Sequence, residues 1–145
     1  MRCERAVWQV SGRVPLGRNI TLGQGTRISV GDSGELVIGN DFCITARSSI
    51  ICHKKVEIGK DVLLSWDNLV MDTDFHHIDD SSISGPIRIG DHVWIGCRCL
   101  VLKSASIPEG SVLAAGAMVT KELPEVNALY GGVNKKLRSD ISWCK

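Results

Sequence analysis

An aliphatic residue returns at every sixth position between residues 89 and 119. Two residues before each of the last five stands a smaller side chain. Positions i−2 and i share one face of an extended strand, so each hexad predicts a short strand with two inward side chains, then a turn. A helix would need spacings of three and four. A fixed six-residue period is typical of a parallel β-helix. The aliphatic positions are Ile89, Ile95, Val101, Ile107, Leu113 and Val119, and the smaller residues are Val93, Cys99, Ala105, Ser111 and Ala117.

The same period runs through the earlier part of the chain, with two changes of phase. One slip lies at residues 31–35 and a second at residues 54–57. We expect each slip at a corner of the solenoid, where an added residue can bulge outward without moving the core. The earlier repeat positions are Leu16, Leu22, Ile28, Ile38, Ile44, Ile50, Ile58, Leu64 and Val70.

The repeat stops between Val70 and Ile89. The intervening segment carries four aspartates and two histidines, and we expect a loop around residues 72–88. Loops held on a rigid scaffold often carry function. Residues 1–145 are expected to form one domain. Its terminal segment, 125–145, is expected to form a short helix, capped near Asn134, that covers the open end of the solenoid.

Composition narrows the classes of function. The 145 residues include 17 basic and 16 acidic side chains, for a net charge of +1, which argues against nucleic-acid binding. No run of 18 apolar residues predicts a membrane span, and the first residues lack the apolar core of a signal peptide. Six cysteines without a CxxC pair indicate reduced thiols, so we expect a cytoplasmic location.

The hexads, the DFH stretch and the run DHVWIGCRCLVLKSASIPEGSVLAAGAMVTKELP together resemble the hexapeptide-repeat acyltransferases. Within that family they are most similar to the galactoside, maltose and polysaccharide O-acetyltransferases, over about residues 36–143. The resemblance implies a left-handed parallel β-helix with three hexads per coil. It also implies a homotrimer with active sites between neighbouring subunits, and acetyl-CoA as the acyl donor.

The resemblance points to His76 as the catalytic residue. Acyl transfer to a hydroxyl needs a base, and imidazole titrates close to neutral pH. The family's catalytic histidine lies in the loop before the VWIG hexads, and His76 in the DFH stretch matches it. Asp74 or Asp72 could orient the ring, and the sequence does not choose between them. In an extended segment His77 would point to the opposite face.

Acceptor-binding candidates lie on neighbouring coils. Trp94 precedes an inward residue, so it should face outward, where a sugar ring or another subunit could pack on it. Asp67 could accept a hydrogen bond from an acceptor hydroxyl, and Arg47 is a weaker candidate of the same kind.

Donor-binding candidates lie near the end of the repeats. Small residues at Ala115 and Gly116 would let pantetheine approach the backbone. The resemblance adds Thr120 and Lys121 near the nucleotide end of CoA, Cys97 after the VWIG run, and Lys136 toward the phosphates. Where relatives commonly have a proline, this chain has Asn134, which puts the fine geometry of the CoA contacts in question.

The sequence therefore predicts an acetyl-CoA-dependent O-acetyltransferase acting on a hydroxyl of a sugar or polysaccharide. Alternatives within the superfamily are serine or an amino sugar as acceptor, and a non-catalytic hexapeptide scaffold is a further alternative. His76, His77 and the aspartates are possible metal ligands by type. Three histidines at ligand spacing are not seen, so we expect neither a metal site nor a metal-dependent hydratase.

Overall fold

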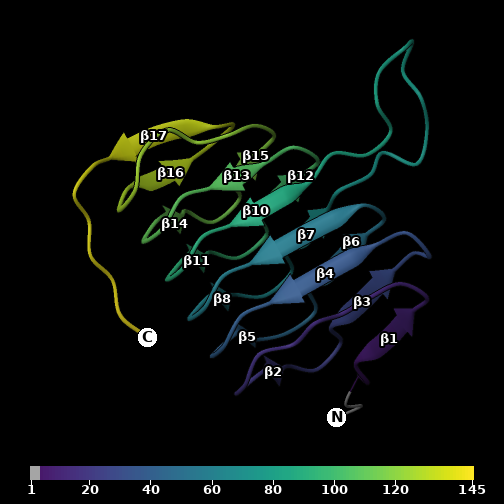
Figure 1. Ribbon diagram of the computed structural model, residues 1–145. Helices are drawn as coiled ribbons and strands as arrows, with labels where there is room; N and C mark the ends of the chain where they lie inside the picture. The colour runs from purple at the N-terminus through teal and green to yellow at the C-terminus, as the bar shows by residue number, and fades with distance from the viewer. Residues whose placement is uncertain (1–3) are drawn as a thin grey trace.

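The computed structural model describes residues 4–145, and these wind into an all-β solenoid in which no residue is helical. Successive coils stack along one axis, from β1 at one end to β16 and β17 at the other (Figure 1). Three sheets form the walls, here called sheets A, B and C. The predicted all-β parallel solenoid is confirmed, and its three-walled coil agrees with the left-handed β-helix that the resemblance implied.

Each coil passes through the sheets in the order C, A, B. Sheet A contains β1 (Val7–Val10), β3 (Arg27–Val30), β6 (Ser49–Cys52), β9 (Leu69–Met71), β12 (Leu100–Leu102) and β15 (Met118–Val119). Sheet B contains β4 (Glu35–Ile38), β7 (Lys55–Ile58), β10 (Ile87–Ile89) and β13 (Ser106–Ile107). Sheet C contains β2 (Thr21–Leu22), β5 (Cys43–Ile44), β8 (Leu63–Leu64), β11 (Trp94–Ile95), β14 (Val112–Leu113), β16 (Leu129–Gly131) and β17 (Lys135–Arg138).

The core is a stack of equivalent residues from successive coils. In sheet C, Ile44, Leu64, Ile95 and Leu113 lie in register on adjacent strands, and each side chain is fully buried. Tyr130 ends this column, and its hydroxyl bonds to the backbone N–H and C=O of Glu125. All eleven residues predicted to face inward between Ile89 and Val119 are buried, which confirms the interpretation of the six-residue period.

The corners use left-handed backbone conformations. Between sheets C and A, the residues Arg47, Asp67, Arg98 and Gly116 stack with φ angles of 48°, 60°, 57° and 75°. Side chains other than glycine rarely adopt such angles. Each N–H at this corner donates to a backbone carbonyl of the preceding coil, as from Asp67 to Ala46 at 3.2 Å. These stacked hydrogen bonds hold the strained conformation in place.

Departures from the repeat gather at the corner between sheets A and B. The first phase slip lies between β3 and β4, and the second begins between β6 and β7. One coil later, the predicted loop leaves the solenoid at the same corner, between β9 and β10, and projects away from it (Figure 1). The loop is therefore the largest of several insertions at this corner.

The predicted C-terminal helix is wrong. Residues 129–138 instead form an antiparallel hairpin of β16 and β17, in which Gly131 pairs with Lys135. The last coil leaves the edge of β16 unpaired, and a returning strand can satisfy that edge, which a helix cannot. Gly132 and Asn134 supply the positive φ angles of the turn, 55° and 52°. Residues 139–145 then run back along the solenoid (Figure 1).

Candidate functional site

Asp72 fixes the base of the projecting loop. Its buried carboxylate accepts hydrogen bonds from the backbone N–H groups of His53, Lys54 and Lys55, at 2.7, 2.8 and 2.8 Å. Burial, reinforced by the Asp72 charge, raises the pKa of the Cys52 thiol to about 12. The Asp72 carboxylate is therefore hydrogen-bonded to the backbone of the preceding coil. In this position it holds the base of the loop and does not orient an imidazole.

The two adjacent histidines differ in their contacts. His77 Nδ1 lies 3.2 Å from the carbonyl of Ser81, within the loop. His76 is exposed and has no hydrogen-bond partner among residues 4–145. Residues 75, 76 and 78 are bends and residues 79–80 form a turn, so the extended geometry expected to separate the two rings is absent. The structure separates them instead by giving only His77 a partner.

Asp74 lies two residues before His76 and forms an ion pair with Lys103, on the next coil. Between them, Phe75 adopts a φ of 61° and its ring meets the ring of His53 edge-on, with 4.8 Å between centroids. The Asp74 carboxylate is thus directed at an ammonium group rather than at the His76 ring. Within one chain, neither candidate aspartate contacts the imidazole it was expected to orient.

A second group of predicted residues lines a groove on sheet C. Trp94 faces outward, as predicted, with 38% of its surface exposed, and its Nε1 donates to Ser65 Oγ at 3.1 Å. The groove has a volume of about 310 Å³ and brings Trp94 together with Cys97 and Ala115. Trp66 also lines it, although sequence reasoning gave that residue no role. The one feature of the sequence that could have indicated this role is the position of Trp66 directly before Asp67, a predicted acceptor-binding residue.

Arg47 and Asp67 meet at the corner between sheets C and A. The guanidinium donates twice to the carboxylate, from Nε at 2.9 Å and from Nη2 at 3.2 Å. The hydrogen bond from Arg47 holds the pKa of the Asp67 carboxyl below its usual range. The two predicted acceptor-binding residues are therefore brought together as one exposed ion pair.

The remaining donor-binding candidates lie near the last coils. At Gly116, a Cβ would meet no atom within 4 Å, so the backbone there is open to a ligand. Asn134 accepts a hydrogen bond from the Thr120 N–H and donates one to Thr120 Oγ1, both at 2.8 Å. Its φ of 52° is closed to proline, so the departure from the family pattern suits the hairpin turn. Lys121 is exposed, and Lys136 pairs with Glu125.

The loop and the groove lie on opposite sides of the solenoid. The loop leaves at the corner between sheets A and B, and the groove lies on sheet C, the wall opposite that corner (Figure 1). One chain therefore does not place His76 against Trp94 and Cys97.

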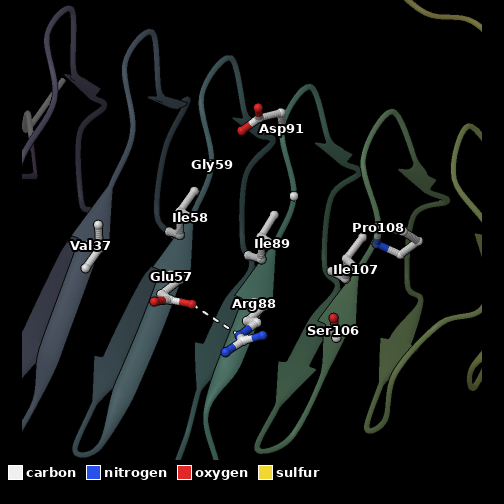
Figure 2. Close-up of a pocket in the computed structure, with 11 residues that line it drawn as sticks. Val37, Glu57, Ile58, Gly59, Arg88, Ile89, Asp91, Ser106, Ile107 and Pro108 are labelled. Carbon is white, nitrogen blue, oxygen red and sulfur yellow. Dashed lines mark ion pairs between the residues drawn. The ribbon is translucent and has the colours of Figure 1, made fainter.

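A further cavity contains none of the predicted site residues. It is a shallow space of about 420 Å³ on sheet B. Figure 2 shows Glu57 and Arg88 side by side across it, with 3.2 Å between Oε2 and Nε. The neighbouring Lys55 holds the pKa of Glu57 below its ordinary value. Glu57 and Arg88 are paired with each other, Asp91 in the lining pairs with Lys60, and the lining includes no histidine or cysteine.

The tail, residues 139–145, forms a cluster that sequence reasoning missed. His92 Nδ1 contacts Asp61 Oδ2 at 2.6 Å, and its Nε2 lies 3.1 Å from the carbonyl of Trp143. The rings of His92 and Trp143 stack at 4.2 Å, and Trp143 Nε1 donates to the His92 carbonyl at 3.0 Å. Lys145 Nζ lies 2.7 Å from Asp61 Oδ1. Trp143 also packs against Trp94, with 6.0 Å between centroids, so the tail supports the aromatic side of the groove.

Three further findings concern the described part of the chain. No group of three or more His, Cys, Asp or Glu side chains is placed to hold a metal ion within residues 4–145. The cysteines in that range are free thiols. No helix long and apolar enough to cross a membrane occurs there.

Comparison with known proteins identifies the repeat. Residues 86–121 match the family model described as the hexapeptide repeat of succinyl-transferase. A probable acetyltransferase of Mycobacterium tuberculosis is 28% identical over 140 residues, which cover 90% of this chain and 46% of that protein. The chain thus spans about half the length of this curated relative.

Solved structures share the fold. A maltose O-acetyltransferase from Clostridium difficile is 27% identical, with a TM-score of 0.74, covering 86% of this chain and 68% of that one. An N-acyltransferase from Bacillus cereus, in complex with dTDP and coenzyme A, is 22% identical. Its TM-score is 0.78, with 92% of this chain and 77% of that chain covered, and at this identity the likeness shows the fold alone. Together, the matches confirm the resemblance to the hexapeptide-repeat acyltransferases.

The tail cluster predicts that Asp61→Asn will loosen residues 141–145. The Lys145 ammonium, with His92, holds the pKa of Asp61 below its usual value. The carboxylate's contribution is therefore complete above about pH 4, the unfolded reference, and is lost as pH falls through the lower folded value. We expect the Ile141 amide, which donates to the Asn127 carbonyl at 2.8 Å, to exchange with deuterium at least about 5-fold faster in the variant at neutral pH.

Asp91→Asn is the matched control. Asp91 pairs with Lys60 at the same corner and does not contact the tail. Unchanged exchange at Ile141 in Asp61→Asn would show that the carboxylate does not hold the tail.

Proposed function

We propose that this chain, which carries the hexapeptide repeat of the acetyltransferases it resembles, transfers an acetyl group from acetyl-CoA to a hydroxyl of a sugar or polysaccharide. The observation that carries the proposal is the exposed imidazole of His76, which lies on a braced loop and has no partner within residues 4–145. The ring nitrogen that takes the substrate proton must be free of such a partner, and the exposed His76 ring leaves it free. The chain covers only 46% of the mycobacterial acetyltransferase, so the activity of that whole protein is carried over to this chain as a proposal.

His76 acts as the general base in direct transfer. Its neutral imidazole takes the hydroxyl proton as the acceptor oxygen attacks the thioester carbonyl carbon. The tetrahedral intermediate then collapses, the C–S bond breaks, and the proton passes from the imidazolium to the departing CoA thiolate. Backbone N–H groups near the VWIG coil stabilise the oxyanion. The ester and free CoA leave, and no covalent acyl-enzyme is required.

The groove on sheet C binds the acceptor and the reactive end of the donor. Trp94 and Trp66 present exposed aromatic surface, on which the apolar face of a sugar ring can stack. The ion pair of Asp67 and Arg47 supplies hydrogen-bonding groups at the neighbouring corner. The structural neighbour that is a maltose O-acetyltransferase supports a sugar as acceptor.

The small residues at Ala115 and Gly116 admit the pantetheine arm, with Cys97 beside it. Thr120, Lys121 and Lys136 lie toward the nucleotide end. The neighbour solved with coenzyme A supports an acyl-CoA donor. The free thiols in the described range fit the reducing cytoplasm, where we place the protein.

A homotrimer would bring the loop of one subunit to the groove of another. The outer face of sheet A is apolar from β9 to β15 and at Ile51 of β6, with half-buried side chains in two register columns. Sheet B instead carries the ion pairs of Lys55, Glu57 and Arg88. An apolar face beside a charged one is typical of a subunit contact. The apolar residues are Ile51, Leu69, Met71, Leu100, Leu102 and Met118.

The acceptor is tested by release of free thiol from acetyl-CoA with maltose, methyl β-galactoside, glucosamine and L-serine. Turnover with maltose or the galactoside supports the proposal. Turnover restricted to glucosamine or serine would move the protein to the alternative acceptors. No turnover with any of these acceptors, together with no binding of CoA, would favour the non-catalytic scaffold.

His76→Ala should lower kcat by about 10²–10⁴-fold, the usual contribution of a positioned base. Folding and CoA binding should survive, because the side chain is exposed and unbonded. His77→Ala is the control, and it should cost far less, since that ring bonds only within the loop. Full activity of His76→Ala would eliminate the mechanism.

Lys121→Ala should raise KM for acetyl-CoA more than it lowers kcat. A phosphate contact remote from the reacting carbon binds the ground and transition states alike. Lys60→Ala, which removes a lysine from another corner, should leave both constants unchanged. An unchanged KM in Lys121→Ala would mean that this lysine is only solvated.

Leu100→Asp should convert the trimer to monomers and abolish most activity. A charge at the centre of the apolar face of sheet A would be buried without a partner in the assembly. Sedimentation velocity at micromolar concentration measures the change. Val37→Asp, on the outer face of sheet B, should leave the assembly intact. A monomeric wild-type protein would remove the shared site.

A further inference from the structure

The His76 loop begins as a short two-stranded stalk. Thr73 and Ser84 form an antiparallel bridge. The Asp74 N–H donates to the Ile83 carbonyl at 2.9 Å, and the Gly85 N–H donates to the Asp72 carbonyl at the same distance. These bonds fix where the loop leaves the solenoid. They end at residue 74, before the segment that carries His76.

Lys103 joins the two arms of the loop just beyond these bonds. Its Nζ pairs with the Asp74 carboxylate on the outgoing arm and donates to the Ser82 carbonyl on the returning arm at 2.7 Å. The Lys103 side chain is only 27% exposed, so its ammonium is partly removed from water. Lysine heads are usually solvated and mobile, whereas this one bonds to two separate segments.

His76 lies between this cross-link and the exposed tip. Asp74 is fixed by Lys103, and Phe75 packs against His53. Beyond His76, residues 77–80 are exposed. The last anchored residue therefore precedes the imidazole directly. A change in the direction of the outgoing arm at Asp74 moves the ring.

We propose that Lys103 is a positioning residue for His76, acting through Asp74 and Ser82 to set the direction of the loop. This inference rests on the proposed function, because it assigns His76 as the base. A base must lie within about 2.6–3.2 Å of the proton it takes. Misplacement by about 1 Å can cost about 10²-fold in rate. Lys103 itself touches neither the substrate nor the imidazole.

The test compares two variants of Lys103. Lys103→Met keeps the approximate length of the side chain without its charge, and Lys103→Arg keeps a charged group with several hydrogen-bond donors. Lys103→Met should lower kcat about 10- to 100-fold, with KM for acetyl-CoA changed by less than about 2-fold. Lys103→Arg should recover most of the rate. Lys60→Met is the control, since that lysine pairs with Asp91 at a distant corner. Rates are measured with acetyl-CoA and the sugar of the panel that reacts fastest.

Hydrogen exchange gives a readout that needs no activity. In Lys103→Met, the Asp74 amide should exchange at least about 10-fold faster, while buried strand amides such as that of Val101 stay unchanged. Unchanged exchange at Asp74 would overturn the cross-link. Faster exchange with an unchanged kcat would overturn the positioning role while leaving the proposed function intact, provided that His76→Ala is inactive.

The double variant separates positioning from any independent effect. If Lys103 acts only through His76, the combination of Lys103→Met with His76→Ala should be no slower than His76→Ala alone. Losses that multiply would overturn the proposal. Full activity of His76→Ala would instead refute the proposed function, and the exchange data would still report whether Lys103 joins the arms.

Discussion

The hydrogen bonding of each coil to the next governs the rest of this molecule. In a stack of parallel strands, a backbone N–H at one level needs an acceptor at the matching place on the level before or after it. Extra residues can therefore leave only where the stack is already bent. The corner between sheets A and B takes the phase slips of the first coils and then the whole projecting loop. The position of the loop that carries His76 therefore follows from the geometry of the coil.

Where the chain leaves the stack, backbone N–H groups lose their carbonyl acceptors, and the Asp72 carboxylate replaces those acceptors. On the coil before, the Glu35 N–H donates to the carbonyl of Lys54, the expected pattern at this corner. One level later the backbone departs into the loop, and the N–H groups of His53, Lys54 and Lys55 would have no carbonyl above them. The Asp72 carboxylate accepts all three. A buried charge is tolerated because these donors satisfy it. The Asp72 carboxylate thus takes the place of the backbone carbonyls that would accept these hydrogen bonds in a regular coil.

The sequence predicts what depends on periodicity. A six-residue repeat identifies the inward residues, such as Ile95 and Leu113, and the outward direction of Trp94. It also marks the loop as the place where the period ends. It does not predict the hairpin of residues 129–138, because that hairpin exists to pair the free edge of β16, which appears only after the coils have stacked. Composition at the C-terminal end carries no signal of that edge.

The sequence also could not predict roles that depend on contacts between distant segments. His92 and Trp143 lie 51 residues apart, and their stacking requires the tail to return along the solenoid. Asp74 was a candidate to orient His76 because it is close in sequence, yet its carboxylate meets a lysine from the next coil. Proximity in sequence is a poor guide in a solenoid, where the nearest neighbour of a corner residue is one coil away. The groups that hold the loop and the groove therefore come from other coils and from the tail, while the groups expected to do chemistry stay exposed.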